Sequence, residues 1–126
     1  MELLNNLQYT KNHEWVLIEG NIATIGITDY AQKELGDIVY VDVDCLEQQL
    51  NADDVFGSVE AVKTVSDLYM PIAGKIIEIN KELENSPELL NKSPYKDGWI
   101  VKVQLLDTAI NNELLSSSQY KTLIGI

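Results

Sequence analysis

The chain has 126 residues, enough for one domain over residues 1–126 whose core needs no metal or disulfide to hold it. Twenty acidic and nine basic residues give a formal net charge of −11. This charge argues against nucleic acids and anionic membranes as partners, because both are recognised by basic patches, and it favours solubility and basic partner surfaces.

Short strands dominate the first half of the chain, where segments rich in β-branched and aromatic residues are separated by turn formers. Thr28 suits a helix N-cap and Gly36 suits a helix end, so a short helix is predicted over residues 29–35. Residues 44–54 are polar and irregular, with a turn at 51–54. The predicted strands of this half cover residues 13–18, 21–27 and 38–43.

The second half begins with a hairpin that carries Lys63 at its tip. Leucine and isoleucine side chains in residues 107–124 then predict two short helices, broken near the serines at 116–118. Between them we expect a strand at 72–80, one helical turn at 87–91, a loop at 93–98 and a strand at 99–103. The whole pattern predicts a mainly β protein with short helices, an antiparallel β sandwich or barrel closed at one end by helices.

Several kinds of site and location are excluded or disfavoured. Cysteine and histidine each occur once, as Cys45 and His13, so an intrachain disulfide is impossible and a zinc site of His and Cys ligands is nearly excluded. No stretch approaches the ~20 apolar residues of a membrane span. Residues 1–6 are acidic and lack the features of a signal or transit peptide. The sequence as given therefore reads as cytoplasmic, or as a mature form already trimmed.

Lys63 is the only basic residue between Lys33 and Lys75, and acidic residues stand on both sides of it at Glu60 and Asp67. A lysine on a hairpin tip is most often a plain solvated charge. A solitary lysine on a rigid hairpin is also well placed to be modified, because its long stem holds the amine in water and away from the body.

This hairpin resembles the lipoyl-attachment hairpin of lipoyl-carrying domains, and more closely that of the glycine cleavage system H proteins. The resemblance rests on Val59-Glu60-Ala61-Val62-Lys63, followed by Ser66-Asp67, Pro71 and Gly74. Biotin-carrying hairpins are similar in shape but typically have methionine on both sides of the lysine. Here the neighbours are Val62 and Thr64, so lipoate is favoured.

The resemblance covers nearly the whole chain and depends on the order and spacing of many short motifs. The further matching residues are Leu7 to Thr10, His13 to Val16, Gly26 to Gln32, Leu35 to Val39, Asn80, Pro87 to Leu89, Asn91, Ser93 to Tyr95 and Gly98-Trp99. The generic lipoyl domains of 2-oxoacid dehydrogenase complexes are shorter and lack both the His-Glu-Trp opening and the Pro-Tyr…Gly-Trp segment.

Three features depart from the family pattern. The family usually has a Leu-Pro pair and a glycine after the predicted strand 38–43, whereas this chain has neither proline nor glycine in residues 45–50. The conformation of residues 44–54, and any partner contact they make, stay open because these turn formers are missing. Ala61 stands where serine is common, and the chain ends at Ile126 without the acidic tail of many relatives.

The resemblance implies a fold of the barrel-sandwich hybrid type and a non-catalytic carrier with lipoate joined to Lys63. Such a carrier moves an aminomethyl group from a pyridoxal-phosphate glycine decarboxylase, the P protein, to a folate-dependent aminomethyltransferase, the T protein. It also passes reducing equivalents to a flavin dihydrolipoamide dehydrogenase, the L protein. Glu60 and Asp67 are expected to matter for recognition by the lipoylating enzyme.

Glu14 is the candidate residue for holding the aminomethyl-loaded arm, by resemblance to the family's arm-holding cleft, and the alternative is a solvated strand residue. Trp15 and Trp99 are expected to be packing residues, and Cys45 is expected to be inert. We expect a monomer. Two other functions stay open: a lipoyl donor or scaffold that serves lipoylation of other proteins, and a lipoyl-like binding module without cofactor.

Overall fold

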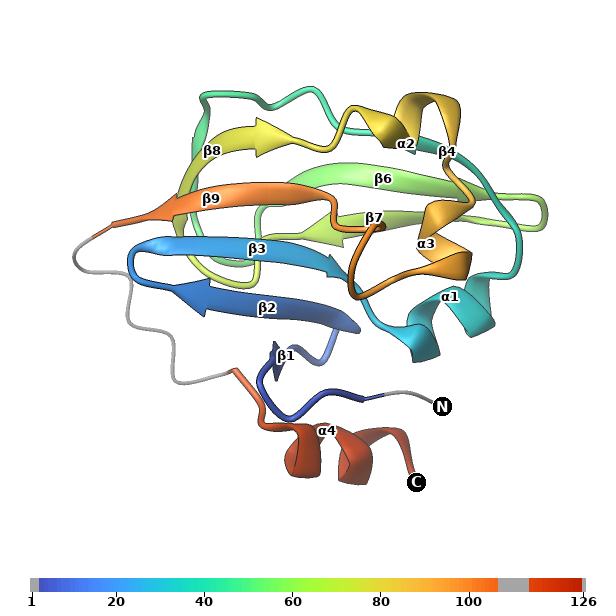
Figure 1. Ribbon diagram of the computed structural model, residues 1–126, viewed down its shortest axis with the longest axis horizontal. Helices are drawn as coiled ribbons and strands as arrows, with labels where there is room; N and C mark the ends of the chain where they lie inside the picture. The colour runs from blue at the N-terminus through green and yellow to red at the C-terminus, as the bar shows by residue number, and fades with distance from the viewer. Residues whose placement is uncertain (1–2, 107–113, 126) are drawn as a thin grey trace.

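Two antiparallel sheets pack against each other in the computed structural model, which describes residues 3–106 and 114–125 (Figure 1). The larger sheet has the order β1-β2-β3-β9-β8-β5 and the smaller the order β4-β6-β7. The strands of the larger sheet are β1 (Gln8–Tyr9), β2 (Glu14–Glu19), β3 (Ile22–Ile27), β9 (Val101–Leu105), β8 (Gly74–Ile79) and β5 (Gln49–Leu50). Those of the smaller sheet are β4 (Ile38–Asp42), β6 (Val55–Ala61) and β7 (Val65–Tyr69).

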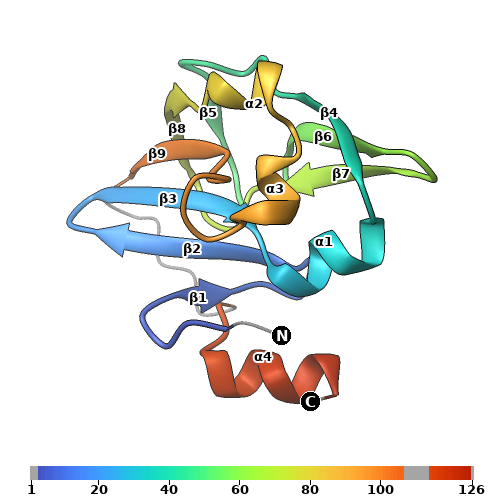
Figure 2. The same ribbon diagram turned by 45° about the vertical axis from the view of Figure 1, so that its right-hand side comes forward.

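Within the described residues, four short helices lie around the sheets, namely α1 (Asp29–Leu35), α2 (Glu82–Asn85), α3 (Leu89–Lys92) and α4 (Ser117–Ile124). The prediction of α1 is confirmed at both ends. The Thr28 hydroxyl accepts a hydrogen bond from the Ala31 amide at 3.1 Å, and the chain leaves the helix through Gly36 at φ +80°. α1 and α3 lie side by side below the β6–β7 hairpin, whose tip projects from the body (Figures 1 and 2).

Two apolar clusters hold these elements together. The main one fills the space between the two sheets, with fully buried side chains such as Ile25 and Val103 from the larger sheet and Val59 from the smaller. The second lies on the other side of β1 and β2 and joins Leu7, Tyr9 and Trp15 to Tyr120 of α4. The second cluster therefore fixes the C-terminal helix to the body, below the sheets in Figure 2.

Some predicted boundaries were wrong. The two-residue strands β1 and β5 and the one-turn helix α2 were missed, because segments so short carry no detectable period. The strand predicted at 99–103 is β9 and begins at Val101. The break predicted near the serines at 116–118 agrees with the start of α4, since residues 114–116 are not helical and Ser116 caps α4 through a capping box with Gln119. The first of the two predicted C-terminal helices falls mainly on residues 107–113, outside the described residues.

The region 44–54 has a defined conformation despite its missing turn formers. A turn over residues 45–48 is closed by a hydrogen bond from the Gln48 amide to the Cys45 carbonyl at 3.0 Å, with Glu47 at φ +68°. The turn predicted at 51–54 is confirmed by the Asp54 amide, which donates to the Asn51 carbonyl at 3.1 Å. Two residues with side chains, Glu47 and Asp53, thus occupy backbone conformations that favour glycine.

Candidate functional site

Lys63 lies at the tip of the β6–β7 hairpin and is exposed to solvent. The Ala61 amide donates to the Thr64 carbonyl at 2.8 Å, which closes the tip around Val62 and Lys63. Among the described residues two ion pairs form, and neither involves Lys63. The Lys63 amine is therefore presented to solvent by a closed turn, with no carboxylate of the described residues within ion-pair distance.

The hairpin tip rests on the turn between α1 and β4. The Val62 amide donates to the Asp37 carbonyl at 3.1 Å, and the Lys63 stem passes over Gly36, where an added Cβ would lie 3.5 Å from Cε. Asn91 of α3 fixes this turn from below: its Oδ1 accepts from the Ile38 amide at 2.9 Å, and its Nδ2 donates to the Gly36 carbonyl at 2.9 Å. Helix α3 thus holds the α1–β4 turn, and this turn holds the hairpin tip that carries Lys63.

Glu60 and Asp67 share one face of the hairpin. Glu60 pairs with Val65 and Ser58 pairs with Asp67, so the two acids are diagonal neighbours on the exposed face of the small sheet. The row continues into β4, where Asp42 pairs with Ser58. Asp42 was not predicted as part of this acidic row, because only the cross-strand register brings it beside the hairpin acids.

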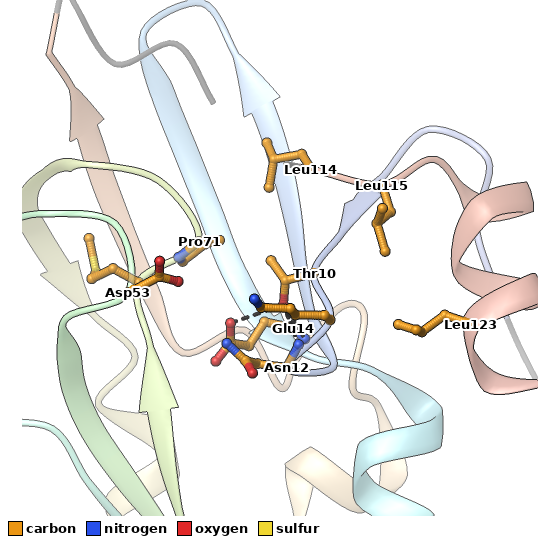
Figure 3. A pocket seen from close by; sticks show the side chains of 10 residues that line it. Thr10, Asn12, Glu14, Asp53, Pro71, Leu114, Leu115 and Leu123 are labelled. Carbon is orange, nitrogen blue, oxygen red and sulfur yellow. Dashed lines mark hydrogen bonds between the residues drawn. The ribbon is translucent and has the colours of Figure 1, made fainter. Parts of the chain in front are cut away.

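Glu14 stands at a different place, in the wall of a cavity of about 310 Å³ (Figure 3). Its side chain is buried, with Oε1 accepting from the Thr10 hydroxyl at 3.1 Å and Oε2 accepting from the Tyr69 amide at 2.8 Å. The alternative reading of Glu14 as a solvated strand residue was wrong. β2 begins at Glu14, and the carboxylate joins it to the end of β7, so one side chain links the two sheets.

Burial raises the pKa of Glu14 to about 8, and the nearby Asp53 carboxylate adds to this effect, while the hydrogen bonds from Tyr69 and Thr10 oppose it. At neutral pH this burial thus favours a protonated Glu14. A cation that entered the cavity would favour the ionised form. The cavity is lined by Thr10, Lys11, Asn12, Glu14, Asp53, Met70, Pro71, Leu114, Leu115 and Leu123.

The structure does not bring Lys63 and Glu14 into contact. The Glu14 carboxylate binds the amide of Tyr69, six residues along the chain from Lys63, and an extended strand rises ~3.3 Å per residue. The separation along β7 is therefore about 20 Å at most. A group attached to Lys63 reaches the cavity only if it lies back along β7.

Other residues singled out in the sequence fall into place as packing residues. Trp15 is buried, its Nε1 donates to the Pro94 carbonyl at 2.8 Å, and a Cβ at Gly26 would lie 2.5 Å from Nε1. The Cys45 thiol is buried, donates to the Phe56 carbonyl at 3.2 Å, and has its pKa raised by burial.

None of the described helices is long and apolar enough to cross a membrane.

The chain is similar to known H proteins over almost its full length. The glycine cleavage H-protein family model matches residues 7–125. The glycine cleavage system H protein of Staphylococcus epidermidis is 56% identical over 125 residues, which cover 99% of both chains. That of Staphylococcus haemolyticus is 55% identical with the same coverage.

A solved structure shows the same fold. The crystal structure of a glycine cleavage system H protein from Mycobacterium marinum matches with a TM-score of 0.90 and 35% identity, covering 98% of this chain and all of that one. This confirms the predicted fold class, mainly antiparallel β with short helices, of the barrel-sandwich type. By family and by fold, the chain belongs to the glycine cleavage H proteins and is the lipoyl carrier of the glycine cleavage system.

Proposed function

We propose that Lys63 carries the lipoyl group through an amide bond and is its only attachment site. Support comes from its exposed position at a closed turn, from the motif around it, and from the lack of an ion pair with any residue that the structure describes. When bound, the lipoyl group supplies a disulfide that accepts the aminomethyl group and becomes a dithiol that is later reoxidised. The chain supplies position and electrostatics, as proteins do for covalently held cofactors.

The partners that fit this role are glycine decarboxylase, the aminomethyltransferase and dihydrolipoamide dehydrogenase, which the tethered arm visits in turn. A tethered group can reach millimolar effective concentration at a docked partner, so a long arm on a rigid hairpin makes each transfer effectively intramolecular. We propose that the chain itself is non-catalytic. The polar side chains of the described cavity wall are Thr10, Lys11, Asn12, Glu14 and Asp53. The Thr10 hydroxyl donates to Glu14 and accepts from the Asn12 and Glu14 amides, so its contacts are those of a turn residue and not of an exposed nucleophile.

Glu14 is proposed to hold the ammonium of the aminomethyl cargo when the arm lies back along β7. The cavity wall offers Glu14, with Asp53 close by, and a buried carboxylate binds an ammonium more strongly than an exposed one. A charge-assisted hydrogen bond shielded from water contributes roughly 1.5–3 kcal/mol. The ammonium would displace the proton from Glu14 and take its place as the positive partner.

Glu60 and Asp67 are proposed to be recognised by the lipoylating enzyme. Both are exposed on one face of the hairpin that presents Lys63. Substitution of either residue is expected to slow lipoylation while changing stability by no more than about half a kcal/mol. We further propose that residues 1–126 act as one monomeric carrier domain and, in keeping with the bacterial relatives, work in the cytoplasm.

The proposal is tested by expressing the chain in cells supplied with lipoate and mapping the modified peptide by mass spectrometry. We expect lipoate on Lys63 and none on the Lys63→Arg variant. Lipoate on Lys75 or Lys81 would contradict the assignment. A glycine–bicarbonate exchange assay with glycine decarboxylase should then require the lipoylated form.

The same two measurements separate the alternatives. A chain that is lipoylated but supports no exchange would be a lipoyl donor or scaffold for other proteins. A chain that is never lipoylated would be a binding module without cofactor. Exchange by the unmodified chain at the rate of the lipoylated one would contradict the non-catalytic carrier role.

A further inference from the structure

The C-terminal segment forms one side of the Glu14 cavity. Leu114, Leu115 and Leu123 face it from one side, and Asp53 and Pro71 lie on the other (Figure 3). Leu123 belongs to α4, near the end of the chain, whereas Glu14 opens β2. The apolar part of the wall therefore comes largely from the C-terminal segment, and the polar part from the residues before and at the start of β2.

This segment is fixed to the body at two places. Tyr9 and Leu115 exchange both backbone hydrogen bonds, at 2.8 and 2.7 Å, which places Leu115 at the cavity. Tyr120 is fully buried and stacks on Tyr9 with ring centroids 4.8 Å apart and planes 9° apart. Leu123 follows Tyr120 by three residues on the same helix, so the buried tyrosine sets the position of the leucine.

The Tyr120 hydroxyl adds a polar anchor. It lies 2.8 Å from the Thr28 hydroxyl and 2.8 Å from Nδ1 of His13. Burial lowers the pKa of His13, against the influence of Glu34, so the neutral ring accepts from Tyr120 while Thr28 donates to it. Thr28 is also the N-cap of α1, so the anchor connects α4 to the helix beneath the lysine hairpin.

We propose that α4 is the outer wall of the cargo cavity: Tyr120 positions the helix, and Leu123 keeps water from the group that Glu14 holds. This inference rests on the proposed role of Glu14. Leu123 keeps 51% of its surface exposed, a large value for a leucine whose side chain packs at a cavity edge, and this fits a side chain that covers an opening. Attack by one water on the loaded arm releases formaldehyde and ammonium and leaves a free thiol, and the wall slows this loss.

Leu123→Ala tests the wall, with Lys121→Ala as the control at an exposed position of α4 that does not line the cavity. In the unlipoylated protein, the titration of Glu14 is followed by carbon NMR of its carboxyl group. Water admitted by Leu123→Ala should lower the Glu14 pKa by about half a unit or more, because burial is the main cause of its elevation. In the Lys121→Ala variant, Glu14 should titrate as it does in the wild type.

The loaded form gives the second readout. After lipoylation and loading, ammonia release should be roughly threefold faster or more for Leu123→Ala than for the wild type, and unchanged for Lys121→Ala. Tyr120→Phe keeps the stacked ring but loses both hydroxyl contacts. Tyr120→Phe should speed ammonia release. It should also speed hydrogen exchange of the Leu115 amide, because a loosened α4 lets the backbone beside the cavity open locally, which a helix remote from the cavity would not cause.

Two outcomes separate this inference from the proposed role of Glu14. If Glu14→Gln speeds ammonia release while Leu123→Ala changes neither the release nor the Glu14 titration, the inference about α4 is overturned and the role of Glu14 stands. If Leu123→Ala lowers the Glu14 pKa but Glu14→Gln releases ammonia at the wild-type rate, α4 is the wall of the cavity. In that case Glu14 does not hold the cargo.

Discussion

A buried carboxyl group with a pKa of about 8 makes Glu14 a source of pH-dependent stability. Between about pH 4.5 and 8 the folded protein keeps a proton on Glu14 that the unfolded chain has lost, so the folded state binds more protons. The free energy of unfolding from this group therefore falls as pH rises through this window, by up to ~1.4 kcal/mol per pH unit, and is level above it.

Urea unfolding of wild type and Glu14→Gln at pH 5 to 9 measures this effect. The glutamine still accepts from the Tyr69 amide and carries no charge, so its stability curve should be flatter and lie above that of the wild type at pH 8 and beyond. His13 titrates alike in both proteins, and the difference between the curves isolates Glu14. Parallel curves would mean that Glu14 is ionised and well solvated.

Glu47 stores backbone strain in the turn over residues 45–48. Its φ of +68° suits glycine, the side chain is exposed, and the conformation is held by the Glu47 amide, which donates to the Ile76 carbonyl at 2.7 Å. Glu47→Gly should raise the free energy of unfolding by about 0.5–1 kcal/mol, the strain removed less the entropy that glycine adds. Thermal unfolding checks this. Glu47→Gln is the control for charge and should stay near the wild type, and equal stability of Glu47→Gly would contradict the strain.

At the scale of the element, the position of the lysine hairpin is fixed in part by α3, a helix that lies far from it in the sequence. Asn91 of α3 binds the α1–β4 turn, and that turn accepts the Val62 amide beside Lys63. The orientation of the arm is therefore set by α3 as well as by β6 and β7. The Nδ2 group of Asn91 also donates to the Gln32 side chain of α1 at 3.0 Å, so three elements meet at one amide.

Asn91→Asp should break this connection. The new carboxylate still accepts from the Ile38 amide, but it faces the Gly36 carbonyl and the Gln32 oxygen, both acceptors, and the loss should cost about 1–3 kcal/mol. Chemical unfolding measures the cost, and faster hydrogen exchange of the Val62 amide reports the loosened tip. Asn85→Asp, at an exposed site of α2, should change stability by less than about half a kcal/mol. Unchanged Val62 exchange would show that the tip is fixed without α3.

The elements differ in how much of them the sequence alone could predict. Helix α1 was predicted to the residue because Thr28 and Gly36 act locally, and the hairpin because its motif is contiguous. Strands of two residues and the one-turn α2 exist through their tertiary partners and leave no period in the sequence. The burial of Glu14 was not predictable for the same reason, since its partner Tyr69 and the wall residue Leu123 are far along the chain.

At the scale of the whole molecule, the acidic residues behind the net charge of −11 are spread over several surfaces. Exposed Asp42 and Asp44 lie along a groove with Asp67, on the side of the small sheet that ends at Lys63. Acidic residues of α2, Glu82 and Glu84, are exposed beside a second groove, which β8 also lines. A partner with a basic surface is attracted by the total charge at long range and is oriented by the local charge at short range.

Charge steering predicts how fast the lipoylated protein associates with glycine decarboxylase. Salt screens charges over ~8 Å at physiological ionic strength, so the association rate constant should fall roughly tenfold or more between low and high salt. Asp42→Asn with Asp44→Asn, and Glu82→Gln with Glu84→Gln, remove the same charge at two places. Stopped-flow association at low salt should be slowed more by the first pair, because those acids lie along the small sheet that carries the lysine hairpin. Equal slowing by the two pairs would show that the total charge alone attracts the partner. An association rate that does not depend on salt, in the wild type and in both double variants, would mean that docking relies on uncharged contacts such as Tyr40, Val62 and Val65.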